Sequence, residues 1–206
     1  MYARSTTIRG NPEKIDEGIA YVRDTVMPAV LQMDGCVGLS MLVDRESGRA
    51  ITTTAWADAQ AMRMSADKVL DIRARAAEIV GGEAEVNEWE IAVMHRMRDA
   101  GDGACARVIW STGDRGQMDR LVDTFRMSMV PRVEELPGFC SVSLLVDRES
   151  GRTVTAVTYE SRDAMDRARE QGMALRQDFS NQMGSEVTEV AAFDVVLAHL
   201  RVPETV

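Results

Sequence analysis

The chain contains two histidines, and they occupy matching places in its sequence. His95 and His199 each stand near the end of an apolar run that alternates with period two, which is typical of a β-strand. An imidazole titrates near neutral pH, so it can act as a general base or bind a haem iron. A histidine that is only hydrogen-bonded at a strand end would give the same pattern. Both residues are therefore candidate catalytic groups, with a structural role as the alternative.

Aromatic and threonine side chains form a second group of candidates, for contact with a small ligand. Trp56 and Tyr159 end equivalent predicted strands, where a large aromatic residue could close the packing of a helix or form the wall of a pocket. Trp110 stands where the other half of the chain has Thr7, so one pocket could be filled while the other is open. The half that carries Thr7 is favoured as the open one. The candidate ligand-binding residues are Thr7, Thr52, Trp56, Trp89, Trp110, Thr155, Tyr159 and Phe193.

The composition excludes several other kinds of chemistry. Three cysteines are too few and too scattered for a disulfide framework, and no spacing of His, Cys, Asp or Glu predicts a metal site. With 24 basic and 33 acidic side chains the net charge is −9, which argues against nucleic acid or an anionic membrane as a partner. No apolar run approaches the roughly 18 residues of a membrane-spanning helix, and the N-terminus lacks a secretory signal. We therefore expect a cytoplasmic protein.

The chain contains two copies of the elements that must position these residues. The heptapeptide VDRESGR occupies residues 43–49 and again residues 146–152, an offset of 103. Matches at the same offset extend over most of each half, and one inserted residue near position 187 changes the offset to 104. A duplicated unit of about a hundred residues explains this pattern. The sequence predicts one domain over residues 1–98, a linker over 99–104 and a second domain over 105–206.

Each half predicts the same order of elements. In the first half, apolar periodicity indicates strands near residues 3–9, 37–43, 50–56 and 89–95, with helices after the first and third strands. The order β-α-β-β-α-β is the ferredoxin-like plan of an α+β protein, which leaves one face of its sheet without helices. We expect the two domains to cover each other's bare sheet faces, as an intrachain pseudo-dimer that forms an α+β barrel. Further association into a homodimer is compatible with this plan.

A known family matches these segments. Residues 136–152, LPGFCSVSLLVDRESGR, together with residues 159–165, YESRDAM, resemble the antibiotic biosynthesis monooxygenase-like domains of the dimeric α+β barrel superfamily. Residues 33–40 and 56–62 resemble the same signature in the first half. The resemblance implies a pocket between the sheet and the helices of each domain, suited to a flat apolar molecule. Some members of the family oxidise polycyclic phenols with molecular oxygen and no cofactor, and others degrade haem.

The family's catalytic residues are not matched in this chain. Where the phenol-oxidising members carry an Asn and a Tyr around the Trp of the third strand, this sequence has Thr52 and Met62, and in the second half Thr155 and Met165. The haem-degrading pattern needs a His and a Trp on the second helix, which has neither. We therefore expect a protein that binds a small hydrophobic or aromatic compound, with no cofactor. It is either a cofactor-independent monooxygenase or a binding module without the family's active site, and haem binding stays as a third alternative.

Overall fold

The structure is a computed structural model that describes residues 1–205, apart from the side chain of Leu200. The order strand, helix, strand, strand, helix, strand occurs twice along the described chain, as the sequence predicts. The first set comprises β1 (Tyr2–Arg9), α1 (Ile15–Tyr21), α2 (Met27–Leu31), β2 (Cys36–Asp44), β3 (Arg49–Trp56), α3 (Ala59–Met64), α4 (Leu70–Val80) and β4 (Glu83–Arg96). The second set comprises β5 (Cys105–Thr112), α5 (Met118–Thr124), α6 (Val130–Glu134), β6 (Phe139–Asp147), β7 (Arg152–Tyr159), α7 (Arg162–Arg167), α8 (Arg169–Met183) and β8 (Glu186–Leu200).

The strands of the described chain form an antiparallel barrel. Their order by hydrogen bonding is β1-β3-β2-β8-β5-β7-β6-β4, and it closes on itself. The predicted α+β class and the intrachain barrel are therefore confirmed. By spatial contact the chain divides into two compact units: unit 1 contains Met1–Trp89 and Val195–Val202, and unit 2 contains Glu90–Asp194 and Pro203–Val206. The predicted domain boundary at residues 99–104 follows the sequence repeat and stays a prediction.

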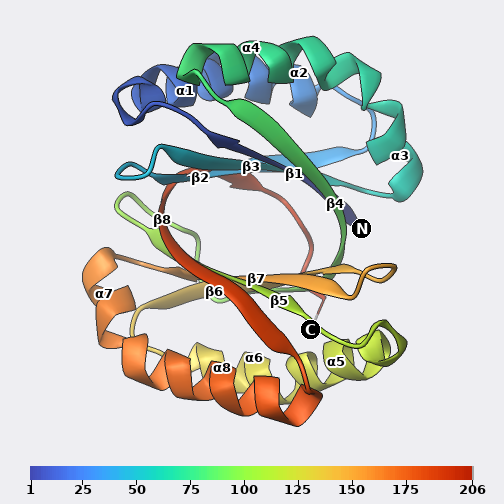
Figure 1. The fold of residues 1–206 in the computed structure, drawn as a ribbon, viewed down its shortest axis with the longest axis vertical. Helices are drawn as coiled ribbons and strands as arrows, with labels where there is room; N and C mark the ends of the chain where they lie inside the picture. The colour runs from blue at the N-terminus through green and yellow to red at the C-terminus, as the bar shows by residue number, and fades with distance from the viewer. Residues whose placement is uncertain (206) are drawn as a thin grey trace. The chain divides into compact units, whose positions relative to one another are not determined.

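In unit 1 the helices lie against one face of a sheet. Strand β3 pairs with β1 on one side and with β2 on the other, and α1, α2 and α4 lie over the face of these strands (Figure 1). The register places Thr6 opposite Thr52, so these side chains point to the same face of the sheet. The apolar side chains of the helices and of β2 are buried between the two layers, with Ile15, Val30 and Leu39 almost fully enclosed.

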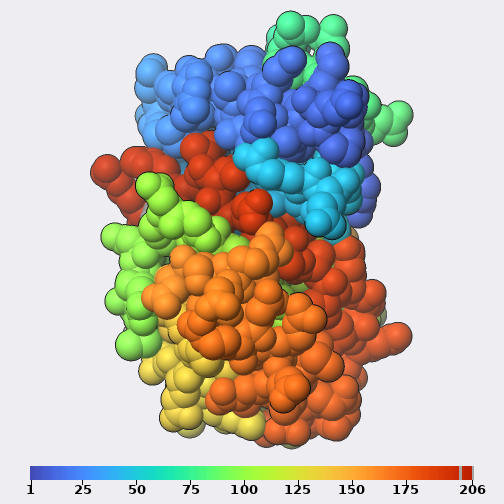
Figure 2. Space-filling view, turned by 90° about the vertical axis from the view of Figure 1, so that its left-hand side faces the viewer, coloured from blue at the N-terminus to red at the C-terminus, as the bar shows by residue number. Residues whose placement is uncertain are grey.

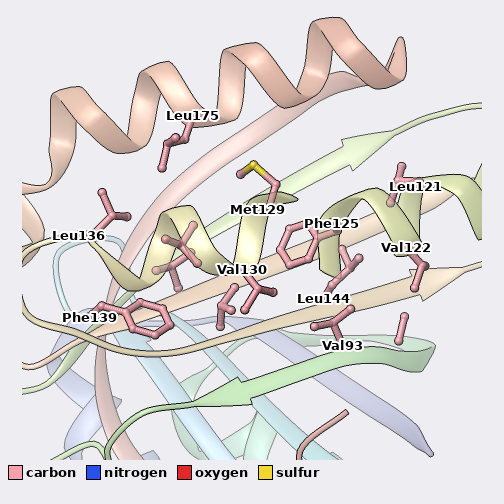
Figure 3. Close-up of a cluster of buried hydrophobic side chains, with 14 of the residues drawn as sticks. Val93, Leu121, Val122, Phe125, Met129, Val130, Leu136, Phe139, Leu144 and Leu175 are labelled. Carbon is pink, nitrogen blue, oxygen red and sulfur yellow. The ribbon is translucent and has the colours of Figure 1, made fainter. Parts of the chain in front are cut away.

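Unit 2 repeats this arrangement with larger side chains. Strand β7 pairs with β5 and β6, and α5, α6 and α8 lie over one face of these strands (Figure 1). Figure 3 shows Phe125 and Met129 of the helical layer between Leu144 of β6 and Leu175 of α8. Burial of this apolar surface is the main stabilising contribution to such a two-layer unit, at roughly 25 cal/mol per Å².

The prolines predicted to kink the first helix of each half stand directly after a π-helical turn. Residues Val22–Val26 and Phe125–Met129 are π-helical, and Pro28 and Pro131 lie in the first turn of the α-helical segment that follows. Proline has no N–H to donate and its ring crowds the preceding turn, so the wider π turn accommodates it without ending the helix. The predicted irregularity is thus a change of helix type.

The repeated VDRESGR segment is a turn whose glycine has a structural task. Gly48 and Gly151 adopt positive φ values of 69° and 78°, and each carbonyl accepts a hydrogen bond from a glycine after the first strand, Gly10 or Gly113. A Cβ at either position would overlap the carbonyl oxygen of that partner glycine. The β2–β3 hairpin, cyan in Figure 2, reaches the molecular surface. The repetition of this motif therefore follows from turn geometry.

The extra residue in the second half is a bulge in β8. Trp110 of β5 lies opposite Glu189, whereas the next residue, Ser111, lies opposite Val187, so one residue of β8 is left over. An additional residue in one strand of a pair is the definition of a β-bulge. Within the part of the chain that the structure describes, no helix has the length and apolar character to span a bilayer.

Candidate functional site

Unit 2 contains a cavity of about 70 Å³ between its sheet and its helices. Its walls are mainly apolar, with Leu144 from β6 on one side and Leu121, Phe125 and Phe179 from the helical layer on the other. The rings of Phe125 and Phe179 meet edge to face, with centroids 5.6 Å apart and planes at 87°. This geometry gives the cavity a rigid aromatic wall, which suits a flat apolar ligand.

Three titratable side chains line the unit 2 cavity and come from different elements. Arg107 comes from β5, Tyr159 from the end of β7 and Arg176 from α8, and all three line the cavity. Burial lowers the pKa of Arg176, and the positive charge of Arg107 lowers it further. Burial raises the pKa of Tyr159 to about 12 although both arginines oppose this shift. The phenol is therefore a neutral hydrogen-bond donor at physiological pH, beside two guanidinium groups.

Neither guanidinium in the unit 2 cavity is neutralised by the chain. Among the described residues, Arg107 and Arg176 have no ion pair or hydrogen bond to another side chain or to the backbone. No described lining residue is an aspartate or a glutamate. The two charges also repel each other, as the lowered pKa of Arg176 indicates. An arginine pair in an apolar cavity is costly without an anion to neutralise it.

Unit 1 contains an equivalent cavity, also of about 70 Å³, lined by the matching pair Arg4 and Arg73. Here the arginine from the first strand is neutralised. Arg4 is buried and donates from Nη2 and Nε to Oε1 of Glu88, at 2.8 and 3.0 Å. It also donates from Nη1 to Oγ of Ser65 at 2.8 Å and from Nη2 to the carbonyl oxygen of Met62 at 2.7 Å. Its side chain is therefore held in place by its own unit.

The partners of Arg4 are alanines in unit 2. Ser65 corresponds to Ala168 at the offset of 103, and Glu88 corresponds to Ala192 at the offset of 104 that follows the bulge. Ala192 lies directly opposite Arg107 in the β5–β8 pairing, which agrees with this correspondence. Two substitutions thus remove both the hydroxyl and the carboxylate that hold the strand arginine in unit 1.

Three of the predicted ligand-binding residues line a cavity. Thr52 lines the unit 1 cavity, and Thr155 and Tyr159 line the unit 2 cavity. Thr7 is not among the described lining residues, and Thr6 takes the position expected for it. Successive side chains of a strand point to opposite faces, so a shift of one residue moves a side chain from the helix-facing side to the other side.

The other predicted aromatic residues pack away from the described cavity linings. Trp56 is fully buried and donates from Nε1 to Oγ1 of Thr54 at 3.0 Å, and Trp89 donates from Nε1 to Oγ of Ser5 at 2.9 Å. Trp110 and Phe193 meet edge to face with centroids 6.3 Å apart. Like Thr7, Trp110 lies on the other face of its strand, because its neighbours Ile109 and Ser111 line the cavity. For these residues the structure supplies a packing role.

The predicted catalytic histidines are likewise not among the described lining residues of either cavity. His95 lies between two carboxylates: its Nε2 is 2.6 Å from Oε1 of Glu134, and its Nδ1 is 2.9 Å from Oε2 of Glu204. Its ring stacks on Phe139 with centroids 6.3 Å apart. Each ring nitrogen therefore faces a carboxylate, and Nδ1 is the one that forms a hydrogen bond. Among the described residues, no three His, Cys, Asp or Glu side chains gather in a way that could hold a metal ion.

The arginines that line the two cavities are not distinguished from the other arginines by the sequence pattern. A signal for them exists, because Arg4 matches Arg107 and Arg73 matches Arg176 at the common offset of 103. Such a match does not show which arginines face inward, since most of the arginines in this chain lie at the surface in ion pairs. The fold is needed to bring each pair to one cavity.

Comparison with known proteins places the chain among close relatives. No protein-family model matches it. It is 51% identical over 206 residues to the uncharacterized protein Rv2557 of Mycobacterium tuberculosis, and the match covers 100% of this chain and 92% of the relative. The uncharacterized protein Rv2558 of the same organism is 48% identical over 207 residues, and the match covers 100% of this chain and 88% of the relative.

Solved structures with the same fold have distant sequences. A candidate monooxygenase from Lactobacillus acidophilus has a TM-score of 0.70 at 11% identity, with 97% of this chain and 96% of that chain covered. A haem-degrading enzyme from Listeria monocytogenes has a TM-score of 0.55 at 10% identity, with 94% and 99% covered. A Listeria monocytogenes ferredoxin-fold protein related to antibiotic biosynthesis monooxygenases has a TM-score of 0.53 at 8% identity, with 95% of each chain covered.

These findings define the class of the protein. The fold is that of the antibiotic biosynthesis monooxygenase-like proteins, with the α+β barrel formed within a single chain. The resemblance seen in the sequence is thereby confirmed at the level of fold. The chain belongs to the family that includes the mycobacterial proteins Rv2557 and Rv2558.

Proposed function

We propose that this protein binds a small apolar or aromatic compound in the cavity of unit 2. The observation that carries the proposal is the combination of an apolar, partly aromatic cavity with three convergent polar groups, Arg107, Tyr159 and Arg176. Ligand sites in proteins typically have this composition, with an apolar lining that supplies affinity and a few polar groups that fix orientation. The named structural neighbours, a candidate monooxygenase and a haem-degrading enzyme, act on or are associated with small molecules, which agrees with this proposal.

The unit 2 cavity is favoured over that of unit 1 because of one position on the helices and one on the strands. Gly172 stands where unit 1 has Val69, so the helix leaves room beside the hydroxyl of Tyr159. A Cβ at Gly172 would meet Tyr159 Oη at 4.0 Å, which is ordinary contact. Arg107 is free of the ion pair that holds Arg4. The two cavities have the same volume of about 70 Å³, so the unneutralised arginine is the main feature that distinguishes unit 2.

Filling the cavity tests the proposal. We expect Gly172→Val to weaken the binding of a flat aromatic compound such as 2-naphthol at least fivefold in isothermal titration calorimetry, because valine would take the space that the ligand needs. Met173→Val is the matched control, since Met173 is half exposed and is not a described lining residue. Equal affinity of the wild type and Gly172→Val, or no binding of any compound in an aromatic panel, would overturn the proposal.

Oxidation of the bound compound is a second candidate function, and the arginine pair favours it. Nearby cations lower the pKa of a bound phenol, and the phenolate is the form that reacts with oxygen. A polycyclic hydroquinone would give two electrons and two protons to O₂, leaving a quinone and hydrogen peroxide. Oxygen uptake with matching peroxide and quinone formation, lost in Arg107→Met, would support an oxidase. Binding without oxygen uptake across a hydroquinone panel would leave a binding protein only.

Haem binding, the third alternative from the sequence, fits the histidines poorly. The two ring nitrogens of His95 lie close to the carboxylates of Glu134 and Glu204, and neither histidine is a described lining residue of a cavity. A haem titration tests the alternative directly: a Soret band that His95→Ala or His199→Ala abolishes would establish haem ligation, and its absence would exclude ligation by these histidines.

A further inference from the structure

The described lining of each cavity carries two arginines and no acidic residue, although the protein as a whole is acidic. The protein has a net charge of −9, yet the described lining of the unit 2 cavity carries two arginines and no acidic residue. Both guanidinium groups are partly buried, and neither has a hydrogen-bonded partner among the described residues. Removing a charge from water is costly unless an opposite charge or a set of hydrogen bonds replaces the lost hydration. The cavity is therefore incomplete without an anion.

Unit 1 serves as an internal reference for what completes such a cavity. There the chain itself supplies the anion, since Oε1 of Glu88 lies 2.8 Å from Nη2 of Arg4. Burial and the charge of Arg4 lower the pKa of Arg73, and the charge of Glu88 opposes this lowering. The corresponding carboxylate is missing from unit 2, where Ala192 faces Arg107. What a carboxylate of the protein does in unit 1, a carboxylate from outside can do in unit 2.

We propose that the unit 2 cavity is specific for an aromatic carboxylate, whose carboxylate group lies between Arg107 and Arg176 and whose ring lies against Phe125 and Phe179. This inference rests on the proposed function and names the class of its ligand. Each guanidinium offers a planar set of N–H donors that matches a carboxylate, and the hydroxyl of Tyr159 is a further donor. The carboxylate would accept hydrogen bonds from donors on β5, β7 and α8. Contacts from three elements fix its orientation, so the ring is directed toward the apolar wall.

The recognition differs from that of a neutral aromatic compound in one measurable respect. A charge-assisted hydrogen bond is stronger than a neutral one, and here it also relieves the repulsion between two cations. An uncharged analogue of the same shape keeps the apolar contacts and loses this contribution. The preference for the anion over its neutral analogue should therefore depend on the arginines of unit 2 and not on those of unit 1.

Calorimetric titration with 2-naphthoate and with 2-naphthamide tests this inference. We expect 2-naphthoate to bind at least tenfold more tightly than 2-naphthamide. Arg176→Met should remove most of this preference, and Arg176→Lys should keep part of it because the charge remains. Arg73→Met is the matched control in unit 1 and should leave the preference unchanged. Circular dichroism melting of each variant establishes that it is folded.

The outcomes separate this inference from the proposed function. If naphthamide binds as tightly as naphthoate, and Arg176→Met has no effect on either, the cavity binds aromatic compounds but the carboxylate preference is wrong. If neither compound binds, the proposed function itself is wrong. If Arg73→Met lowers naphthoate affinity as much as Arg176→Met does, the anion is not held in unit 2 and the inference is overturned.

Discussion

Oε1 of Glu88 accepts hydrogen bonds from both Nη2 and Nε of Arg4, at 2.8 and 3.0 Å. The two residues lie 84 positions apart in the sequence, on β4 and β1. Their ion pair neutralises the strand arginine of the unit 1 cavity, and the repeat has kept the arginine but not the glutamate in unit 2. This difference gives the two cavities different electrostatics although they have a common origin.

Removing the glutamate should turn the unit 1 cavity into a second anion site. In Glu88→Ala the pair Arg4 and Arg73 has no carboxylate, as in unit 2, so we expect the stoichiometry of 2-naphthoate to rise from one to two per chain. The loss of two hydrogen bonds between charged groups should lower the free energy of unfolding by about 3 kcal/mol, because Arg4 stays buried without its carboxylate. Calorimetry and urea unfolding measure these two quantities. An unchanged stoichiometry in a folded variant would count against the role of Glu88.

The converse substitution should close the unit 2 site. Ala192→Glu places a carboxylate on β8 opposite Arg107, where unit 1 has its own glutamate. We expect naphthoate binding to fall at least tenfold, because the added carboxylate competes for the guanidinium. Ala192→Gln is the control of similar size, and it should lower the affinity less because it carries no charge. Equal losses in the two variants would indicate that side-chain volume, and not charge, controls binding.

Tyr159 should contribute a hydrogen bond and not a charge. Because burial raises its pKa to about 12, the phenol stays protonated through the physiological range and can donate to a bound carboxylate. We expect Tyr159→Phe to weaken naphthoate about three- to tenfold, in line with the loss of one hydrogen bond, with little effect on naphthamide. The affinity ratio of the two compounds should be constant from pH 7 to 9. A break in that ratio within this range would show that the phenol ionises there.

The turn glycines of the repeated heptapeptide should be required for stability. Both adopt positive φ, and a Cβ at either would overlap the carbonyl of Gly10 or Gly113. We expect Gly48→Ala and Gly151→Ala each to lower the free energy of unfolding by about 1–3 kcal/mol. Gly101→Ala is the control, because a Cβ there meets no atom within 4 Å. If all three variants have the same melting temperature, the turn geometry is not the reason that the motif is retained.

The C-terminal segment of unit 2 should make stability depend on pH in the acid range. Partial burial raises the pKa of Glu204, but the hydrogen bonds from the Arg96 N–H and the His95 ring outweigh it and hold that pKa below the ordinary value of 4.5. A carboxyl group whose pKa is lower in the folded state than in the unfolded state stabilises the fold at pH values above its unfolded-state pKa. This stabilisation is lost as the pH falls through the folded-state pKa. Glu204→Gln should therefore melt earlier than wild type at pH 7, and the two melting temperatures should converge below pH 4. A constant difference down to pH 3 would contradict this.

The sequence was sufficient for the architecture because the architecture depends on short-range patterns. Period-two alternation in residues 37–43, the repeated turn and the helical spacing each report local structure, and the repeat supplied two versions of every element. The bulge in β8 is also visible in the sequence, as the change of offset from 103 to 104. The π-helical turns before Pro28 and Pro131 are not, since a proline within a helical pattern is equally compatible with a kink or an end.

The site was harder to predict, for two physical reasons. Residues 3–9 carry polar and apolar side chains on both faces of the strand, so nothing in the pattern shows whether Thr6 or Thr7 faces the helices. The charge state of each cavity depends on pairs such as Arg4 with Glu88, whose members are brought together only by the sheet. Of the aromatic residues and histidines predicted for the site, Tyr159 lines a cavity, whereas Trp56 and Trp89 form packing contacts and His95 lies between carboxylates.

The most direct test of the account is a titration of methyl-labelled protein with 2-naphthoate, observed by nuclear magnetic resonance. Leu144 and Leu175 line the unit 2 cavity, and their counterparts Met41 and Ile72 line that of unit 1. We predict saturable shifts of the Leu144 and Leu175 methyl signals, and unchanged signals from Met41 and Ile72. Equal shifts in both units, or shifts confined to methyl groups outside the cavities, would contradict an aromatic carboxylate site in unit 2.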